Sequence, residues 1–490
     1  MKVLLVAAEA FPFAKVGGLA DVAGSLPKPL KEKGLDIRVI IPLYDKIDRA
    51  KYNIEFSGVE FDVPMAGENI RGALYCGKFP DSGIPVYFIG CPGFFGREGI
   101  YTDPKTGKGY PDDAERFVFF SKAIIPALRG LGWIPDLIHA NDYQTGIVPA
   151  MLELGYAGWD FSKTASLYSI HNLAYQGRFA PRILDYLDFG RDQFFPMGPF
   201  EFFGQVNFMK IGILFANMVN TVSPTYAKEI QKSEEYGYGL EGVLHENREK
   251  LSGIINGIDD TIWNPTVDKE IPYNYSPEDL SNKRMCKIAL LKEVGLPSDN
   301  PDVPLIGMIS RLAAQKGFDI LLPIMEKIIE SGCRIVVLGT GDKEYEEKLS
   351  ALAKENPDSI AVVIGFKNML SHLIEAGADL FLMPSRYEPC GLNQMYSMAY
   401  GTIPIVRKTG GLADSVDQAD LNRDLGTGFV FENYDSDALL TAVKSAIWSY
   451  KDQHAWRKLQ VRAMEKDFTW GASADKYIEI YHKAIAANRA

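Results

Sequence analysis

The chain has few cysteines and histidines, and it carries no excess of positive charge. Its five cysteines and six histidines are not spaced as in a disulfide framework or a zinc site. The formal net charge at pH 7 is −11, so we expect no general attraction to nucleic acid. A negatively charged protein still binds an anion where arginine, lysine and helix N-termini gather around it.

Long apolar runs are absent as well. No stretch approaches the roughly 18 consecutive apolar residues of a membrane-spanning helix. The apolar run at residues 3–8 is too short for the core of a signal peptide, and Glu9 follows it at once. We therefore expect a soluble, cytoplasmic protein without a membrane partner.

Short apolar runs alternate with helix-length segments over the whole chain. Hydrophobic residues make up 47% of the 490 residues, and this length predicts two or three domains. Apolar runs separated by helices are typical of parallel strands that are buried on both faces. We predict strands at residues 3–8, 37–41, 86–89, 137–140, 165–170 and 218–222, and in the second half at 305–309, 335–338, 361–364, 380–383 and 403–406. The fold class is α/β, with two doubly wound domains that meet near Asn256.

Some helix boundaries can be predicted from single residues. Ser223-Pro224 supplies an N-cap and a first-turn proline to a helix at 225–231. Pro27 conflicts with an uninterrupted helix after the first glycine pair, so we expect a kink or an offset start there. Ser473 is a candidate N-cap of the last helix.

One glycine-containing segment occurs twice. Lys15-Val-Gly-Gly-Leu-Ala-Asp21 recurs as Lys408-Thr-Gly-Gly-Leu-Ala-Asp414, and each copy follows an apolar run and precedes a helix-like stretch. Glycine lets a backbone approach a ligand closely, and helix N-termini attract anions. The alternative is that each copy is only a structural turn. The repetition favours two similar halves that bind one anionic ligand.

Two loops that follow predicted strands of the second half carry charged residues. Arg311 and Lys316 share the loop after 305–309 and suit a diphosphate, through a planar fork and a compact charge. The alternative is a solvated basic pair. Glu388 lies between the strand at 380–383 and an apolar helix. It either accepts hydrogen bonds from sugar hydroxyls or stabilises the N-terminus of that helix.

Polar residues also end two predicted strands of the first half. His139-Ala-Asn-Asp142 and His171-Asn172 follow these strands, although a lone histidine is more often a structural donor than a catalyst. No Asp-x-Asp stands at a strand end, so if the chain is a sugar-nucleotide enzyme, we do not expect it to hold the diphosphate through a divalent metal. Gly339-Thr-Gly-Asp342 resembles part of a dinucleotide fingerprint, but Glu344 occupies the place of its third glycine.

Taken together, six motifs resemble bacterial glycogen synthase and plant starch synthase. They are Lys15-Val-Gly-Gly-Leu-Ala-Asp21, Ser169-Ile-His-Asn-Leu-Ala-Tyr-Gln-Gly177, Ile255-Asn-Gly-Ile-Asp259, Ser310-Arg-Leu-Ala-Ala-Gln-Lys-Gly317, Pro384-Ser-Arg-Tyr-Glu-Pro-Cys-Gly391 and Lys408-Thr-Gly-Gly-Leu412. The similarity runs in order over almost the full chain. Each motif is weak alone, whereas the ordered set is highly specific.

The resemblance implies a glycosyltransferase B-type fold, in which two Rossmann-like domains face a central cleft. The expected domains are 1–255 on the acceptor side, 256–468 for the nucleotide sugar, and a helix at 469–490 that crosses back to the first domain. The implied reaction moves glucose from ADP-glucose to the 4-hydroxyl at the non-reducing end of an α-1,4-glucan, glycogen or starch. The α-configuration is retained, and no cofactor and no metal is needed.

The resemblance also assigns roles to single residues. It implies that Arg311 and Lys316 bind the diphosphate, that Glu388 holds the donor glucose, and that Lys15 belongs to a loop for donor binding and cleft closure. His171 is similar to a histidine that faces the transferred sugar, and Asp142 to an acidic residue near the reacting centre. The remaining expected substrate-binding residues are Gly18, Asp21, Tyr101, Asn172, Asn256, Cys390, Gly391, Leu392, Thr409, Gly410 and Gly411.

We predict a front-face mechanism, in which the leaving phosphate helps to take the acceptor proton and no carboxylate forms a covalent intermediate. One departure from the family pattern is Tyr143, which follows Asp142 where the family commonly has tryptophan. The alternatives are the same chemistry with UDP-glucose, a glucan-binding protein without catalysis, and a nicotinamide dehydrogenase. A glucan phosphorylase is much longer and needs pyridoxal phosphate, for which the chain has no motif.

Overall fold

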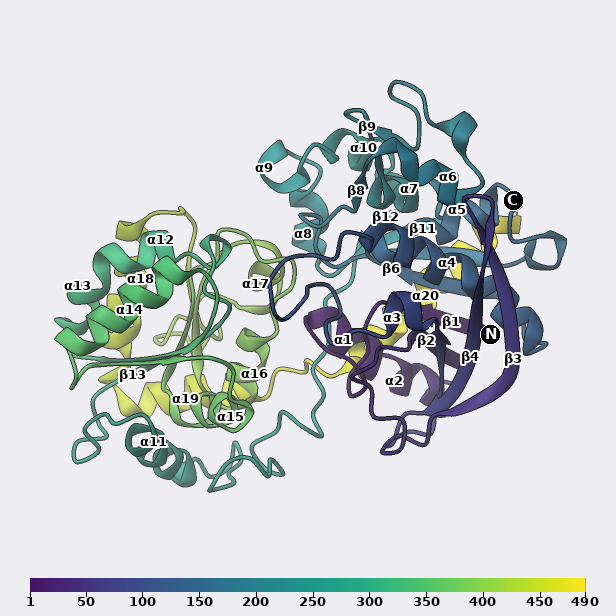
Figure 1. Cartoon of the computed structure of the whole chain (residues 1–490). Coiled ribbons are helices and arrows are strands. Elements are labelled where there is room, and N and C mark those ends of the chain that lie inside the picture. The colour runs from purple at the N-terminus through teal and green to yellow at the C-terminus, as the bar shows by residue number, and fades with distance from the viewer. Residues whose placement is uncertain (490) are drawn as a thin grey trace. The chain divides into compact units, whose positions relative to one another are not determined.

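The computed structural model describes residues 1–489, which form two compact units. The N-terminal unit comprises Met1–Gly257 together with the last helix, α20 (Trp470–Arg489), and the second unit comprises Ile258–Thr469. Each unit has its own hydrophobic core and its own large sheet (Figure 1).

The sheet of the N-terminal unit has nine strands in the order β12-β11-β7-β6-β1-β2-β5-β4-β3. Seven of them pair in parallel: β1 (Lys2–Val6), β2 (Asp36–Pro42), β5 (Pro85–Gly90), β6 (Leu137–Asn141), β7 (Ala165–Ile170), β11 (Met218–Thr221) and β12 (Leu251–Gly253). Six of these strands were predicted, because buried parallel strands are continuous apolar runs. Numbered by their sequence, the parallel strands follow the Rossmann order 3-2-1-4-5-6, extended by one strand.

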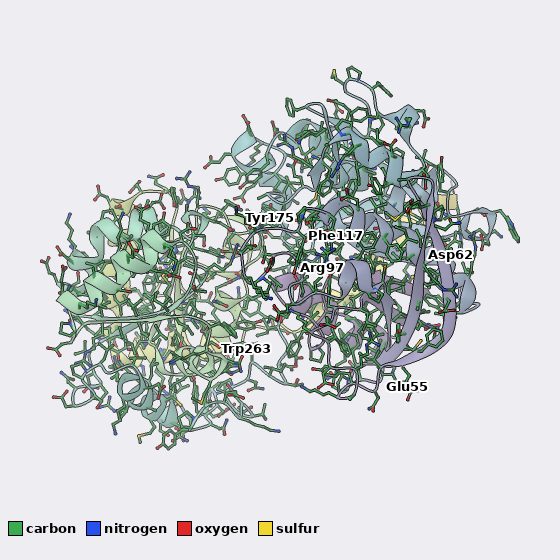
Figure 2. The ribbon with its side chains drawn as sticks, in the orientation of Figure 1. Glu55, Asp62, Arg97, Phe117, Tyr175 and Trp263 are labelled. Carbon is green, nitrogen blue, oxygen red and sulfur yellow. The ribbon has the colours of Figure 1, made fainter. Side chains whose placement is uncertain are left out.

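The edge of this sheet is an antiparallel hairpin that the sequence did not predict. It consists of β3 (Glu55–Met65) and β4 (Glu68–Lys78), joined by a turn in which Ala66 and Gly67 both have positive φ. Along β3, Glu55 and Asp62 are exposed (Figure 2), whereas Phe61 and Val63 are buried. This alternation replaces the apolar run by which the parallel strands were recognised.

The helices of the N-terminal unit begin where single residues dictate. The segment after the first glycine pair forms two helices, α1 (Gly18–Ser25) and α2 (Pro27–Glu32), and Pro27 occupies the first turn of the second. Ser223 caps α8 (Pro224–Glu229), because its hydroxyl accepts the Tyr226 N–H at 2.9 Å. Both predictions are therefore confirmed. The other elements are α3 (Pro92–Phe95), α4 (Asp113–Gly130), α5 (Val148–Glu153), α6 (Leu184–Leu187), α7 (Phe208–Phe215), α9 (Glu234–Gly237), α10 (Glu241–Glu246) and a small sheet of β8 (Arg178–Phe179), β9 (Glu201–Phe202) and β10 (Gln205–Asn207).

The last helix, α20, is part of the N-terminal unit and runs along its sheet (Figure 1). Tyr477, Tyr481 and Ala484 form its buried face, and the Tyr481 hydroxyl lies 3.0 Å from Nδ1 of the buried His139. The prediction that Ser473 caps this helix is wrong. The helix begins at Trp470, and the Ser473 hydroxyl instead donates to the carbonyl of Ile255 at 2.7 Å.

The second unit is built on a parallel sheet of six strands in the order β15-β14-β13-β16-β17-β18, again the Rossmann order. The strands are β13 (Leu305–Ile309), β14 (Arg334–Gly339), β15 (Ile360–Ile364), β16 (Leu380–Met383), β17 (Ile403–Arg407) and β18 (Phe429–Phe431), of which all but the last were predicted. The helices are α11 (Ser281–Glu293), α12 (Phe318–Leu321), α13 (Met325–Ile329), α14 (Lys343–Glu355), α15 (Asn368–Gly377), α16 (Asn393–Ala399), α17 (Gly410–Ser415), α18 (Ser436–Tyr450) and α19 (Gln453–Met464). The predicted fold class, two doubly wound α/β domains, is therefore confirmed.

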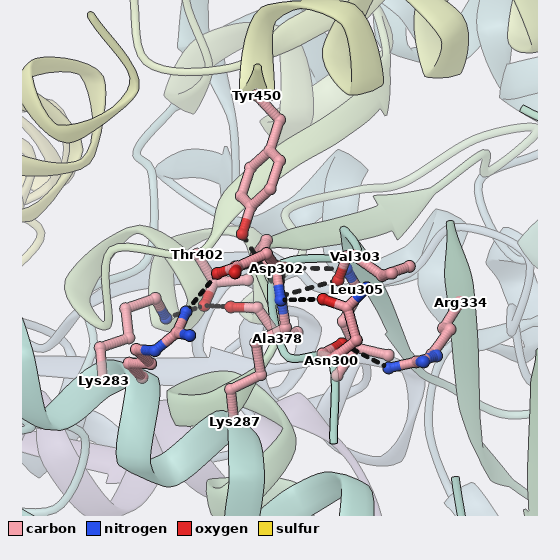
Figure 3. Close-up of polar contacts among 12 residues, drawn as sticks. Lys283, Lys287, Asn300, Asp302, Val303, Leu305, Arg334, Ala378, Thr402 and Tyr450 are labelled. Atoms are coloured by element: carbon pink, nitrogen blue, oxygen red, sulfur yellow. Dashed lines mark hydrogen bonds and ion pairs between the residues drawn. The ribbon is translucent and has the colours of Figure 1, made fainter. Parts of the chain in front are cut away.

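Two buried lysines fasten α11 to the rest of the second unit. Lys283 donates to the Thr402 hydroxyl at 2.7 Å, and Lys287 donates to the carbonyl of Val303 at 2.8 Å (Figure 3). Lys287 also forms a buried ion pair with Asp379, whose carboxylate accepts the Leu305 N–H at 2.8 Å. These bonds hold the amino ends of β13 and β16, so the loops at the opposite, carboxyl ends are carried by a fixed frame.

None of the described helices has the length and apolarity needed to cross a membrane. All five cysteines have free thiols.

Candidate active site

In the second unit, two loops that follow neighbouring strands meet through a pair of opposite charges. Nζ of Lys316, on the loop after β13, lies 2.6 Å from Oε2 of Glu388, on the loop after β16. The Ser385 hydroxyl donates to the same oxygen at 3.0 Å. Both charged side chains are largely buried, with exposed fractions of 18% for Lys316 and 8% for Glu388. These two hydrogen bonds hold the Glu388 side chain in one orientation.

Close backbone contacts fix the two loops against each other. The Arg386 N–H donates to the carbonyl of Gln315 at 2.8 Å, and the Gln315 amide donates to the carbonyl of Tyr387 at 3.2 Å. Gly317 has φ of +80°, and a Cβ there would lie 2.0 Å from the carbonyl oxygen of Pro384. Only glycine fits at this position. Arg311 is exposed on the same loop, and its guanidinium donates to Oε1 of Gln315 at 3.4 Å.

The second glycine pair supports the backbone of Glu388. The Gly411 N–H donates to the carbonyl of Glu388 at 3.1 Å, and a Cβ on Gly410 would lie 2.0 Å from that same oxygen. Thr409, just before this pair, is fully buried. The Gln394 amide donates to the carbonyls of Cys390 and Gly391, each at 3.1 Å. Leu392 follows as the residue before α16. The structure therefore brings eight predicted residues of this unit together around Glu388, namely Lys316, Glu388, Cys390, Gly391, Leu392, Thr409, Gly410 and Gly411.

In the N-terminal unit, Asp142 and His171 end the neighbouring strands β6 and β7. Oδ1 of Asp142 accepts the His171 N–H at 2.8 Å, and Nε2 of His171 lies 2.9 Å from Oδ1 of Asn141. Burial raises the pKa of Asp142 to about 7, although backbone N–H groups of His171 and Asn172 oppose the shift. Burial lowers the pKa of His171 to about 4, so its imidazole is neutral at pH 7.

The backbone around Asp142 is unusual. Asp142 has φ of +55°, in the left-handed region that non-glycine residues rarely occupy. Such a conformation persists only where its surroundings hold it, and it is common at functional sites. The Asn172 side chain accepts the Ala174 N–H at 3.0 Å and so turns the chain after β7. Asp142, His171 and Asn172 are thus held together by backbone bonds.

The first glycine pair follows β1, and an acid that the sequence analysis did not single out holds it. Oε2 of Glu9 accepts the N–H groups of Val16 and Gly17, the latter at 3.2 Å. Glu9 is only 3% exposed, and burial raises its pKa to about 7 although the two N–H groups and Tyr101 oppose the shift. Its position was the available signal, because it lies between the apolar strand β1 and the first glycine pair.

The remaining predicted residues of the N-terminal unit lie on or near that loop. Lys15 forms an ion pair with Asp21 at 2.6 Å, and Gly18 is the first residue of α1. Tyr101 is partly buried, and burial raises its pKa well above the usual value. Asn256 is 5% exposed, and its side-chain oxygen has no hydrogen-bond partner within residues 1–489.

Two other expectations concern a metal site and the dinucleotide-like segment at Gly339-Thr-Gly-Asp342. Within residues 1–489, no three His, Cys, Asp or Glu side chains are grouped as metal ligands. A Cβ on Gly339 would lie 2.0 Å from the carbonyl oxygen of Ser310, and a Cβ on Gly341 would lie 2.3 Å from that of Leu312. These glycines therefore let the loops after β13 and β14 pack together.

Comparisons with known proteins identify the family. The model of the starch synthase catalytic domain matches residues 2–246, and that of glycosyl transferases group 1 matches residues 297–460. The chain is 42% identical to a glycogen synthase of Syntrophotalea carbinolica and 45% identical to one of Thermosipho africanus, each over 100% of both chains.

Solved structures agree with this result. The catalytic domain of starch synthase IV from Arabidopsis thaliana, bound to ADP and acarbose, matches with a TM-score of 0.91 and 34% identity over 99% of both chains. A sucrose-phosphate synthase from Thermosynechococcus elongatus shares the fold, with a TM-score of 0.60 and 17% identity over 99% of both chains. The chain therefore belongs to the glycogen synthase and starch synthase family, glycosyltransferases of the B-type fold with two Rossmann-like domains.

Proposed function

We propose that this glycosyltransferase moves glucose from ADP-glucose to the 4-hydroxyl at the non-reducing end of an α-1,4-glucan, and that it retains the α-configuration. The observation that carries the proposal is the buried pair of Lys316 and Glu388, which the second glycine pair supports. The named relatives are glycogen synthases, and the starch synthase IV structure contains ADP and acarbose.

The donor is proposed to bind at the carboxyl edge of the second sheet. Arg311 and Lys316 supply positive charge for the diphosphate, a role that metal ions fill in other enzymes. Glu388 then accepts hydrogen bonds from hydroxyls of the donor glucose. Because two positively charged side chains balance the leaving group, we propose that no metal and no cofactor is required.

The proposed transfer needs no covalent enzyme intermediate. The bond between C1 of glucose and the phosphate oxygen breaks, and C1 bonds to O4 of the acceptor on the same face. The proton of that hydroxyl passes to the departing phosphate, so ADP leaves with it. His171 is neutral at pH 7, which suits a hydrogen-bond donor or acceptor to the sugar. Asp142 is aligned by backbone N–H groups and is proposed to orient the reacting centre.

The test is incorporation of labelled glucose into glycogen from ADP-glucose, with UDP-glucose in parallel and EDTA in both assays. Incorporation from ADP-glucose that survives EDTA supports the donor and the metal-free site together. A clear preference for UDP-glucose overturns the donor and keeps the chemistry. Absence of transfer from either donor contradicts the proposal and favours a glucan-binding protein.

A further inference from the structure

The carboxylate of Glu9 connects the first glycine pair to a second loop of the N-terminal unit. Its Oε2 accepts the N–H groups of Val16 and Gly17, and the Tyr101 side chain forms a hydrogen bond with the same carboxylate. Val16 and Gly17 lie between β1 and α1, whereas Tyr101 lies between α3 and α4. One buried side chain therefore joins two loops that are far apart in the sequence.

The loop of the first glycine pair has an inner side that contacts Glu9 and an open side at Gly18. A Cβ built on Gly17 would lie 3.6 Å from Oε1 of Glu9, whereas a Cβ on Gly18 would meet nothing within 4 Å. Gly18 is also the first residue of α1, and backbone N–H groups at such a position attract anions. Glu9 therefore takes the inner N–H groups of the loop and leaves its open side to a ligand.

The burial of Glu9 indicates that its hydrogen bonds are needed. Only 3% of the residue is exposed, and an ionised carboxylate is costly to bury unless hydrogen bonds compensate. An apolar side chain of the same length would fill this space without that cost. It would, however, leave the N–H groups of Val16 and Gly17 without their acceptor, which is unfavourable in a folded protein. The acid at this position is therefore explained by the loop that it holds and not by packing.

Glu9 also lies close to the proposed reacting centre. The strands β1 and β6 are parallel neighbours, with Val6 paired with Ala140, so the residues that follow them gather at one edge of the sheet. The charge of Glu9 helps to raise the pKa of Asp142, which follows β6. The loop that Glu9 holds begins at Lys15, which the family resemblance assigns to donor binding. The backbone bonds of Glu9 thus set the position of a loop beside the place of transfer.

We propose that Glu9 is a positioning residue for glucosyl transfer, whose carboxylate holds the first glycine pair in the arrangement that binds the donor. It acts through the backbone of Val16 and Gly17 and touches no substrate itself. The proposal rests on the proposed function, because it presumes a nucleotide-sugar donor beside this loop. Its direct consequence is that loss of the acceptor oxygens weakens donor binding and leaves acceptor binding unchanged.

The test compares two variants of similar size. Glu9→Gln keeps an acceptor oxygen for the N–H groups, whereas Glu9→Met has only a weakly accepting sulfur. The matched controls are Glu375→Gln and Glu375→Met. Glu375, on α15 of the second unit, is fully buried, and burial raises its pKa as it does that of Glu9. Its carboxylate oxygens have no hydrogen-bond partner within residues 1–489, so the controls remove a buried acid without removing a bond.

Hydrogen exchange in the peptide that contains Val16 and Gly17 measures the hold on the loop directly. These N–H groups should exchange about tenfold faster in Glu9→Met than in wild type, because their acceptor is lost. Exchange in Glu9→Gln and in both Glu375 variants should match wild type within about threefold. Equal exchange in Glu9→Met and wild type overturns the proposal.

Steady-state kinetics measure the consequence for transfer. Glu9→Met should raise KM for ADP-glucose about tenfold, whereas Glu9→Gln should stay within about threefold of wild type. KM for glycogen should stay within about twofold in both, as should every constant of the controls. An unchanged KM for ADP-glucose in Glu9→Met overturns the proposal. An equal rise in KM for glycogen also overturns it, because that result indicates a general defect of the N-terminal unit.

Calorimetric binding of ADP and of UDP, without any glucan, separates this inference from the proposed function. A nucleotide affinity that is about tenfold weaker in Glu9→Met than in wild type, and restored in Glu9→Gln, supports the positioning role even if no glucose is transferred. Equal affinity in Glu9→Met and wild type overturns that role, whatever the transfer assay shows. Absence of binding of either nucleotide by the wild type overturns it as well.

Discussion

The ammonium of Lys316 lies 2.6 Å from the carboxylate of Glu388, and this pair joins loops that are 72 residues apart in the sequence. The two charges neutralise each other where both side chains are largely buried. A diphosphate offers Lys316 a second, more highly charged partner, and it leaves Glu388 with acceptor capacity for sugar hydroxyls. The two residues of this contact therefore have both proposed functions of the site, diphosphate binding by Lys316 and glucose binding by Glu388.

Replacement of Lys316 should abolish most of the transfer activity. Lys316→Gln removes the positive charge that is proposed to stabilise the leaving diphosphate, and we expect kcat to fall by about 100-fold or more. Glucose incorporation into glycogen measures this loss. The matched control is Lys348→Gln, which breaks an exposed ion pair of the same 2.6 Å length with Glu344. Wild-type activity in Lys316→Gln would contradict the assignment.

The close approach of the loops around Gly317 can be tested with a second glycine. Gly317→Ala places a Cβ 2.0 Å from a backbone oxygen, whereas Gly332, with φ of +86°, has open space around its Cβ position. Gly332→Ala should lower the free energy of unfolding by about 1 kcal/mol, because of backbone strain alone. Gly317→Ala should cost about 2 kcal/mol more, because the backbone must also shift. Thermal unfolding compares the two variants, and equal costs would contradict the steric argument.

The parallel strands could be predicted by a local rule, because buried strands are apolar runs. Loops at the carboxyl ends of such strands meet at one edge of the sheet, but position alone left the roles of Lys316 and Glu388 open, and only the family resemblance implied a shared site. The structure places these two side chains in contact. The roles of these residues stay predictions.

Features that depend on tertiary contacts were not predictable. Glu9 served only as evidence against a signal peptide, because its position before the glycine pair does not show that the N–H groups of Val16 and Gly17 bind its carboxylate. The repeated segments also differ in detail. Lys15 pairs with Asp21, but Lys408 pairs with Glu432, a residue outside the repeat. The identical residues therefore occupy equivalent positions in the two units, but they do not form the same contacts.

The pH dependence of stability should reveal the buried Glu9. Its pKa is about 7 in the folded protein against 4.5 for the ordinary group, so the folded state binds more protons between these values. Stability from this group is present below pH 4.5 and is lost as the pH rises to 7, by at most about 3 kcal/mol. Relative to wild type, Glu9→Gln should therefore become more stable as the pH rises.

Scanning calorimetry from pH 4.5 to pH 8 measures this difference. The comparison of variant with wild type cancels the opposite effect of His139 and His171, whose lowered pKa values favour stability at higher pH. Asp142 also has a pKa of about 7, and the charge of Glu9 helps to raise it, so Glu9→Gln should lower the pKa of Asp142 and change stability in the same direction. A melting-temperature difference that is independent of pH would show that Glu9 has no raised pKa.

Arg116 is fully buried on α4, and none of its three guanidinium nitrogens has a hydrogen-bond partner within residues 1–489. Its charge is balanced by Asp113, 3.7 Å away, and by aromatic rings such as that of Phe117 (Figure 2), 5.0 Å from the guanidinium carbon. Removal of Asp113 alone leaves the buried guanidinium without its carboxylate partner. Removal of both side chains leaves no unpaired buried charge.

We therefore expect Asp113→Ala to lower the free energy of unfolding by about 2 kcal/mol, and Arg116→Met to lower it by less than about 1 kcal/mol. The double variant should be more stable than Asp113→Ala alone, because methionine fills the apolar surroundings without an unpaired charge. A double-mutant cycle from thermal unfolding gives the coupling energy. Additive effects would mean that the 3.7 Å pair contributes nothing to stability. In that case the lost bond between Tyr143 and Asp113 would account for the whole cost of Asp113→Ala.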